Sequence, residues 1–320
     1  MIYVLVVAVL AAAGIAVLAA HARDYVSRSE ARWPPEGRFI EAEGVRLHMR
    51  EHGPADAPRI LLIHGASANL LELWGPLAPE LAGDHRVIAF DRPGLGHSAR
   101  PRRNAETLAA QAKMAARVLE AAGEGPALVV GHSLGAGVSL RLALDFPHLV
   151  SGLVLVAPAS HPYPGENAWW AKLSAAPLLG DAFCGLIIPW LGPILGQAGI
   201  ANNFWPAPTP ATYFEDAGVG LIFRPRAFAA SARDVIATRA EFAAQAPNYP
   251  EIFAPTVIVT AEKDRVVSPK RHARALAIDL PAAELVIAPQ TGHMPHRLRT
   301  DLVLAAIRRV NAMAAPSPDR

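Results

Sequence analysis

Three side chains of this sequence have the types and the order needed for nucleophilic attack on a carbonyl group. Ser133 lies in the stretch Gly131-His132-Ser133-Leu134-Gly135, and Asp264 and His293 follow it along the chain. A serine hydroxyl is too weakly acidic to attack by itself, so a histidine must accept its proton and a carboxylate must orient that histidine. We therefore expect a triad of Ser133, His293 and Asp264, which implies neither a metal ion nor an organic cofactor.

The segment around Ser133 predicts a strand, a sharp turn and a helix. Leu128 to Val130 is typical of a buried strand, and Val138 to Leu144 has helical spacing. A strand-to-helix turn brings neighbouring backbones close together, so glycines are needed on both sides of the serine. The similar stretch Gly96-His97-Ser98-Ala99-Arg100 lacks the second glycine and lies in a turn-rich loop, so Ser98 is not expected to be a nucleophile.

Other ionisable residues compete for roles in this triad. Glu262 lies two residues before Asp264, and Asp91 ends a neighbouring strand, where we expect it to stabilise a glycine-rich loop. His132 adjoins Ser133, but a turn that presents one side chain to a cleft points its neighbour elsewhere. Asp264 and His293 remain the preferred acid and base because each follows a strand and would project from the same sheet edge as Ser133.

Length, composition and charge exclude several classes of protein. The chain has 320 residues, of which 52% are hydrophobic and 18% charged, enough for one large core and a smaller accessory unit. Its net charge of +2 provides no strong field for nucleic acid, so we expect no nucleic-acid partner. The single cysteine, Cys184, excludes an intrachain disulfide framework and a cysteine-based zinc site.

Strand-like and helix-like segments alternate along most of the chain. This alternation predicts an α/β fold, a mostly parallel sheet with helices on both faces, built from residues 38–157 and 251–313. Residues 158–250 interrupt it with twelve prolines and four of the six tryptophans, and residues 182–214 carry no charge. We therefore expect residues 158–250 to be a separate, largely helical insertion.

These motifs, in this order, resemble the α/β-hydrolase family, in the branch that has a cap inserted in the core domain. The resemblance covers roughly Arg38 to Ala312 and implies that Ser133, Asp264 and His293 are nucleophile, acid and base. The negative oxygen of the tetrahedral intermediate needs two donors. Leu134 follows the nucleophile at a helix N-terminus, and Ala66, after His64-Gly65, matches the second donor of the family; both would act through backbone amides.

The predicted cap is rich in aromatic residues, as a lid over an apolar substrate would be. The alternative is that the uncharged residues 182–214 only form ordinary hydrophobic core. Prolines and glycines between residues 185 and 199 argue against a second membrane span there. The cap residues that we expect around the substrate are Trp169, Trp170, Trp190, Phe204 and Trp205.

The N-terminus begins with an apolar segment. Residues 2–20 carry no charge and nearly match a hydrocarbon core of about 30 Å. We expect an uncleaved membrane anchor, followed by a linker from Arg23 to Gly37. The arginines after the span place the catalytic domain on the cytoplasmic side. The alternative is a signal peptide cleaved after Ala22, which would make the protein periplasmic or secreted.

The expected activity is hydrolysis of a carboxylic ester with a mainly apolar acyl group, through an acyl-enzyme on Ser133. Ser133 counts against dehalogenases and epoxide hydrolases, which resemble this chain but have an aspartate nucleophile. Carbon–carbon bond hydrolases and cofactor-free haloperoxidases share the triad and stay open, although Met294 stands where the former usually have tryptophan. A binding module of the same fold without catalysis is a further alternative.

Overall fold

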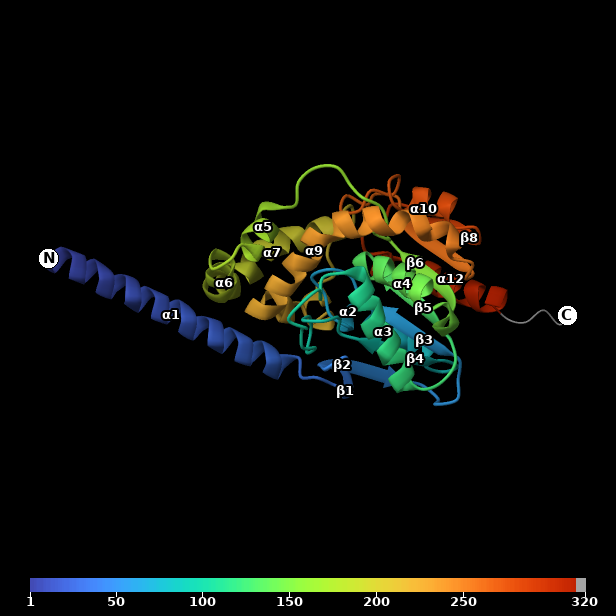
Figure 1. Ribbon diagram of the computed structural model, residues 1–320, viewed down its shortest axis with the longest axis horizontal. Coiled ribbons are helices and arrows are strands. Elements are labelled where there is room, and N and C mark those ends of the chain that lie inside the picture. The colour runs from blue at the N-terminus through green and yellow to red at the C-terminus, as the bar shows by residue number, and fades with distance from the viewer. Residues whose placement is uncertain (315–320) are drawn as a thin grey trace, which may run out of the picture.

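A long N-terminal helix projects from the body of the protein (Figure 1). The computed structural model describes residues 1–314, and its first helix, α1, runs from Ile2 to Arg32. At about 1.5 Å per residue, its 31 residues form a rod of about 46 Å. Residues 2–17 are exposed, and burial begins at Leu18. By length and composition, α1 and the segment Leu179–Phe204 could each cross a membrane.

The prediction of a linker from Arg23 to Gly37 is wrong for its first ten residues. Residues 23–32 continue α1 without interruption. No glycine or proline occurs between Ile15 and Trp33, so nothing in the backbone ends the helix before Pro34. Ala22 and Ser29 are buried and lie two helical turns apart on one face, which packs against the body of the protein.

One β-sheet lies at the centre of the protein, between two hydrophobic clusters. Within residues 1–314, eight strands form one sheet in the order β1-β2-β4-β3-β5-β6-β7-β8, in which β1 and β2 are antiparallel to their neighbours and the others are parallel. The fold is therefore α/β with a mostly parallel sheet, as predicted. The strands are β1 (Arg38–Ala42), β2 (Val45–His52), β3 (Arg59–Ile63), β4 (Arg86–Phe90), β5 (Ala127–His132), β6 (Val150–Val156), β7 (Thr256–Ala261) and β8 (Ala283–Ala288).

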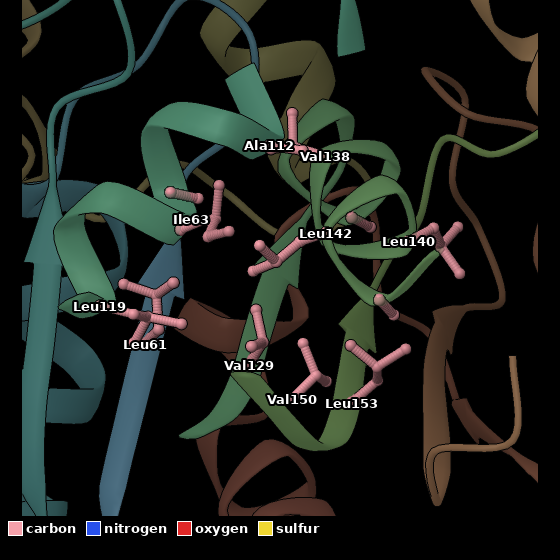
Figure 2. Close-up of a cluster of buried hydrophobic side chains, with 14 of the residues drawn as sticks. Leu61, Ile63, Ala112, Leu119, Val129, Val138, Leu140, Leu142, Val150 and Leu153 are labelled. Atoms are coloured by element: carbon pink, nitrogen blue, oxygen red, sulfur yellow. The ribbon is translucent and has the colours of Figure 1, made fainter. Parts of the chain in front are cut away.

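Helices cover both faces because the central strands are apolar on both sides. In β3, Leu61 and Ile63 join one buried cluster, whereas Ile60 and Leu62 join the cluster on the other face. Figure 2 shows the first cluster, where Val129 of β5 and side chains of two helices surround Leu61 and Ile63. The helices on this face are α3 (Leu108–Ala122), α4 (Leu134–Asp145) and α10 (Ala273–Asp279); α2 (Leu71–Leu81) and α12 (Thr300–Ala314) cover the other.

The chain between β6 and β7 is made of helices and loops and lies over one end of the sheet (Figure 1). Phe204, Tyr213 and Phe223 form a small core of its own. We call this region the cap. Its elements are α5 (Trp169–Ala175), α6 (Leu179–Ala182), the π-helix η2 (Phe183–Ile187), α7 (Ile188–Phe204), α8 (Tyr213–Asp216), η3 (Val219–Phe223), α9 (Pro225–Gln245) and η4 (Ala246–Glu251).

The second half of α1 packs against the cap, where it contacts η2, α7 and η3. The Tyr25 hydroxyl donates to the Gly220 carbonyl at 2.9 Å. Arg224, which is buried, pairs with Glu30 of α1 at 2.6 Å. Trp33 follows the helix, and its indole N–H donates to the Glu215 carbonyl at 2.9 Å. The N-terminal helix is therefore part of the folded body from about Leu18 onward.

Candidate active site

Ser133 sits at the turn between β5 and α4, with φ 52° and ψ −119°. Such a backbone conformation is rare outside glycine, so the surrounding structure must hold it. The Ser133 amide donates to the Val156 carbonyl of β6 at 3.0 Å. A Cβ on Gly131 would lie 2.7 Å from Ala136 Cα, and one on Gly135 would overlap the Ile63 carbonyl. The two predicted glycines are thus required by close backbone approach.

The structure brings Ser133, His293 and Asp264 into one hydrogen-bonded chain. His293 Nε2 lies 3.0 Å from Ser133 Oγ, and His293 Nδ1 lies 2.7 Å from Asp264 Oδ2. Because a carboxylate only accepts, Nδ1 carries a proton, and in the neutral ring Nε2 is left to accept from the serine hydroxyl. Ser133 and His293 are 8% and 4% exposed, so the chain is largely shielded from water.

The loop after β7 holds Asp264 in place. Its other oxygen, Oδ1, accepts from the amides of Val266 and Val267 at 2.7 and 2.9 Å. Glu262, the competing acid, instead accepts from the Gln290 amide at 2.9 Å and is not bonded to the histidine. The geometry therefore favours Asp264 over Glu262 as the partner of His293.

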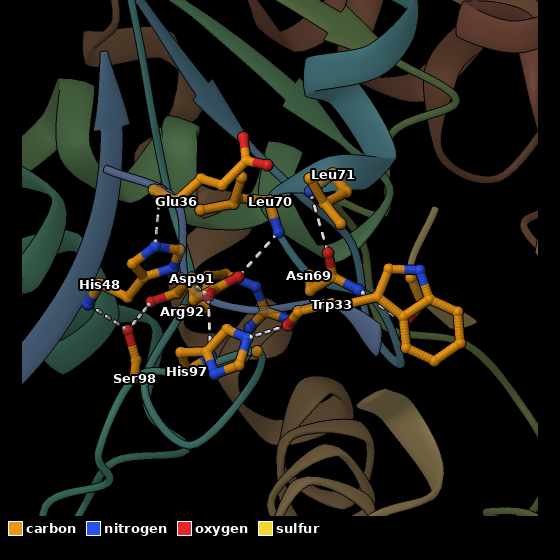
Figure 3. A network of polar contacts seen from close by, with 12 residues as sticks. Trp33, Glu36, His48, Asn69, Leu70, Leu71, Asp91, Arg92, His97 and Ser98 are labelled. Atoms are coloured by element: carbon orange, nitrogen blue, oxygen red, sulfur yellow. Dashed lines mark hydrogen bonds and ion pairs between the residues drawn. The ribbon is translucent and has the colours of Figure 1, made fainter. Parts of the chain in front are cut away.

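Asp91, the other competing acid, organises a loop network at a different place (Figure 3). Its carboxylate accepts from His48 Nδ1 at 2.7 Å and from the amides of Leu70 and His97 at 2.8 Å each. Burial alone would raise the pKa of Asp91, but the hydrogen bond and charge of His48 outweigh it and lower that pKa.

The same network ties the segment after α1 to the core (Figure 3). His48 Nε2 lies 2.9 Å from the Glu36 carbonyl, and His97 Nε2 lies 2.8 Å from the Trp33 carbonyl. His48 thus has an oxygen atom within hydrogen-bond distance of each ring nitrogen, one from the Asp91 carboxylate and one from the main chain of Glu36.

The two predicted oxyanion donors flank Ser133. Leu134 is the first residue of α4, so its amide is one of the N-terminal N–H groups that have no partner within the helix and suit an anion. Ala66 lies in the loop after β3. A Cβ on the preceding Gly65 would be 3.1 Å from Ser133 Cβ, which places this loop against the serine. Within residues 1–314, the Ala66 N–H makes no hydrogen bond to the protein.

Behind the triad, His132 packs between two other histidine rings. Its ring centroid lies 4.9 Å from that of His293 and 4.3 Å from that of His296. Burial, and then the neighbouring His296 and His293, lower the pKa of His132 well below its usual value, so the ring stays neutral. Its Nε2 lies 3.0 Å from the His293 carbonyl and donates to it. His132 therefore fixes the main chain of the loop that carries His293.

Glu72 of α2 is a buried carboxylate that sequence reasoning missed. It accepts from His296 at 2.8 Å, from Arg297 at 3.0 Å and from the Tyr213 hydroxyl of the cap at 2.7 Å. Burial would raise the pKa of Glu72, but the His296 hydrogen bond and the Arg297 charge hold it well below its usual value. No local pattern could have revealed this site, because all three partners lie more than 140 positions away.

The five aromatic cap residues predicted around the substrate do not form one wall. Trp169 and Trp190 are 68% and 51% exposed on the outside of the cap. Trp170 is half-buried, and its ring centroid lies 5.4 Å from that of Phe228. Phe204 is fully buried, with its ring centroid 4.8 Å from that of Tyr213, so it supports the cap and does not face a substrate.

Trp205 and its neighbours reach the loop that carries His293. The Asn203 carbonyl accepts from the His293 amide at 2.7 Å. A Cβ on Gly292 would overlap the Trp205 carbonyl, so the end of α7 lies directly on this loop. The Arg265 guanidinium stacks 3.1 Å from the centroid of the Trp205 ring. The cap therefore touches the loop of the candidate base His293 through main-chain contacts.

Comparisons with known proteins agree with this architecture. Residues 58–299 match the sequence profile of the alpha/beta hydrolase fold. An uncharacterized protein of Mycobacterium tuberculosis (strain ATCC 25618 / H37Rv) is 30% identical over 271 residues, which cover 82% of this chain and 77% of that protein. The 2-hydroxymuconate semialdehyde hydrolase of Pseudomonas sp. (strain CF600) is 36% identical over 142 residues, 43% of this chain and 50% of that enzyme.

A solved structure extends the similarity to nearly the whole chain. The crystal structure of a bacterial membrane phospholipase A superimposes with a TM-score of 0.67 at 23% identity, and the match covers 99% of both chains. At this identity the likeness shows the fold. The profile match covers most of the chain, and the strand order and the serine-bearing turn agree with it: this protein belongs to the α/β-hydrolase fold family.

Proposed function

We propose that the protein hydrolyses a carboxylic ester with a mainly apolar acyl group. Ser133 is the nucleophile, His293 the general base and Asp264 the carboxylate that orients it. The observation that carries this proposal is the continuous chain Ser133 Oγ to His293 Nε2 at 3.0 Å and His293 Nδ1 to Asp264 Oδ2 at 2.7 Å. Geometry of this kind is what an activated serine requires.

The reaction proceeds in two halves. Ser133 Oγ attacks the ester carbonyl carbon while His293 Nε2 takes the hydroxyl proton, and the amides of Leu134 and Ala66 stabilise the oxyanion. When the intermediate collapses, the carbon–oxygen bond to the alcohol breaks and His293 returns its proton to the leaving oxygen. A water molecule, deprotonated by His293, then attacks the acyl-enzyme and releases the acid and Ser133.

The apolar acyl group is supported by the cap. Residues 182–214 carry no charge, and α7 within them ends on the loop of His293. The absence of charged side chains from this part of the cap favours an apolar acyl chain over a charged one. The similar proteins include one named as a lipase, from Mycobacterium tuberculosis, and one named as a membrane phospholipase A, and both names agree with such a substrate.

The N-terminal helix is proposed as a retained membrane anchor with the catalytic domain on the cytoplasmic side. Burial of α1 begins at Leu18, inside the apolar run of residues 2–20, so the cap meets the helix where the bilayer would end. Exposed apolar side chains gather on nearby cap elements and would face the interface. They are Leu178, Leu179, Trp190, Ile194 and Leu195. Ala22 is buried against the body of the protein, which shields the bond after it and favours retention over cleavage there.

The test combines a fluorophosphonate probe with a panel of p-nitrophenyl esters of increasing acyl length. We expect the probe to label the wild type but not Ser133→Ala, and longer acyl chains to be hydrolysed with higher kcat/KM. A folded wild type that is not labelled would overturn the serine mechanism and favour a binding module. Labelling without turnover of any ester would favour the carbon–carbon bond hydrolase or the haloperoxidase, each testable on its own substrate class.

A further inference from the structure

Arg92 is a fully buried arginine that touches the loop of the second oxyanion donor. It follows Asp91 at the end of β4, and none of its side chain is exposed. Its Nε donates to the His64 carbonyl at 2.9 Å, and its Nη2 donates to the Gly65 carbonyl at 2.7 Å. The backbone amide of Arg92 also donates to His64 Nε2 at 3.0 Å. Two consecutive carbonyls of this loop are therefore held by one guanidinium fork.

His64 adds a second donor to the carbonyl of Gly65. Because its Nε2 accepts from the Arg92 amide, its proton is on Nδ1, which lies 2.9 Å from the Gly65 carbonyl. Burial, and then the Arg92 charge, lower the pKa of His64 to about 3, so this tautomer persists at neutral pH. The Gly65 carbonyl thus accepts from both Arg92 and His64.

The orientation of that carbonyl decides where the Ala66 amide points. The Gly65 carbonyl and the Ala66 N–H belong to one planar trans peptide unit, in which the two bonds point in opposite directions. A carbonyl fixed toward Arg92 therefore turns the Ala66 N–H away from Arg92. That N–H makes no hydrogen bond within residues 1–314, as an amide that waits for a substrate oxygen requires.

The cap holds this arrangement from the other side through two residues of α9. Asp234 Oδ2 pairs with Arg92 Nη1 at 3.0 Å, and both side chains are fully buried. Ser231, one turn earlier, accepts from the Ser67 amide at 2.9 Å and lies 2.7 Å from the Ser67 hydroxyl, oxygen to oxygen. Ser67 has φ 46°, an unfavourable conformation for serine that these bonds stabilise.

We propose that Arg92, held by Asp234 of the cap, is a positioning residue that aims the Ala66 amide at the oxyanion. The inference rests on the proposed function, because it assigns how one donor of that site is oriented. Its consequence is specific: the donor matters in the transition state, where the oxygen is charged, and little in the bound ester. Loss of Arg92 should therefore lower kcat and leave KM nearly unchanged.

The chain offers a matched control in Arg100. Its Nη2 pairs with Asp234 Oδ1 at 2.8 Å, and its Nη1 donates to the Pro93 carbonyl, but it does not bond the His64–Ala66 loop. Arg92→Lys and Arg100→Lys both keep a positive charge near Asp234. Only the first removes the fork from the carbonyls of His64 and Gly65.

We expect Arg92→Lys to lower kcat by about 10- to 100-fold, less than removal of a donor itself, and to change KM by less than about threefold. The affinity for a trifluoromethyl ketone, which forms a charged adduct with the serine, should fall in parallel with kcat. Arg100→Lys should change both by less than about threefold. Thermal melts of both variants give the folded fraction.

Ser231→Ala is the second variant, in case Arg92→Lys does not fold. It removes two bonds to Ser67 and leaves the buried charges in place, so it should lower kcat by about threefold to tenfold with KM unchanged. Full kcat in folded Arg92→Lys would overturn the positioning role. If only Ser231→Ala folds, full kcat there would show that the alignment of the Gly65–Ser67 loop does not limit the reaction, and this would overturn the role as well. An active Ser133→Ala would instead overturn the proposed function, so the two failures are distinguishable.

Discussion

The sheet edge and the cap hold the two sides of the candidate active site in different ways. At the sheet edge, main-chain pairing and close glycine contacts fix Ser133, and the loop after β7 fixes Asp264. The cap reaches the same site through a few isolated polar contacts, such as Tyr213 to Glu72 and the Asn203 carbonyl to the His293 amide. The three side chains of the candidate triad thus come from the edge of the sheet, while the loop of His293 is also held by the cap.

The largest effect is expected from removal of a side chain of the candidate triad. Ser133→Ala and His293→Ala should each lower kcat for a p-nitrophenyl ester by about a million-fold, and the double variant should lose little more, because the two act as one unit. Steady-state kinetics on the three variants measure this. Losses that add up in the double variant would mean that the two residues act independently and would refute the triad.

A smaller effect is expected from the orienting acid. Asp264→Asn keeps the hydrogen bonds of Oδ1 to Val266 and Val267 but no longer enforces the tautomer of His293, so kcat should fall by about 10⁴-fold with an unchanged melting temperature. Glu262→Gln is the matched control and should stay within about threefold of the wild type. A reversed ranking of the two variants would show that Glu262 is the acid.

Truncation of α1 tests the role of the cap, because the second half of this helix packs on cap elements. Deletion of residues 1–22 should preserve hydrolysis of a soluble short ester, since Tyr25, Glu30 and Trp33 keep their contacts. It should lower the rate on a long ester in vesicles on the order of tenfold, because confinement to the membrane raises the local concentration of substrate.

Deletion of residues 1–37 is the companion experiment. It removes those contacts with the cap as well, and activity on the soluble short ester should now fall together with thermal stability. Equal activity of the two truncations on the short ester would show that the docked half of α1 does not support the cap. Equal rates of wild type and the shorter truncation in vesicles would contradict the proposed role of the membrane.

A further expected effect concerns the stability of the protein, and not its rate, where the cap meets the core. Burial, and then His161 and Arg271, lower the pKa of His272 to about 4. Its Nδ1 accepts from the amides of Ser160 and His161 at 3.1 Å each, so protonation there would oppose two donors. Because the folded pKa lies below the unfolded value of about 6.5, this residue stabilises the fold fully above pH 6.5.

That contribution is lost as the pH falls from about 6.5 toward 4, and it amounts to on the order of 2–3 kcal/mol in the free energy of unfolding. His272→Asn offers an acceptor near the position of Nδ1 and cannot take up the proton. Chemical denaturation between pH 7 and pH 4 should therefore show a shallower loss for the variant. Identical slopes for both proteins would refute a neutral, buried His272.

The sheet and the serine turn were predictable because their signals are local. The strand before Ser133, its two glycines and the helix after it lie within about twenty residues, and parallel pairing then carries Asp264 and His293 to the same edge. The helical nature of residues 23–32 was missed because the apolar run ends at Ala20. The spacing of Ala22, Tyr25 and Ser29 and the absence of glycine and proline were the available signals.

The contacts between cap and core had no such signal. Asp234 stands beside Arg233 on a helix and resembles a surface residue, yet it is fully buried against Arg92, 142 positions away. Phe204 was predicted to contact the substrate because the cap is aromatic and uncharged there, but its side chain fills the core of the cap. Pairings of this kind depend on how the cap and the core meet in three dimensions, which local residue types and spacing do not reveal.

The continuous helix α1 also limits how the molecule can orient. A domain on a flexible tether tumbles and presents every side to the bilayer in turn, whereas α1 enters the body as one rod held by Tyr25, Glu30 and Trp33. With its apolar end in a bilayer, rotation about two axes is largely removed and only spinning about the helix axis is free. The protein would then diffuse in two dimensions with its cap at a constant height above the lipid.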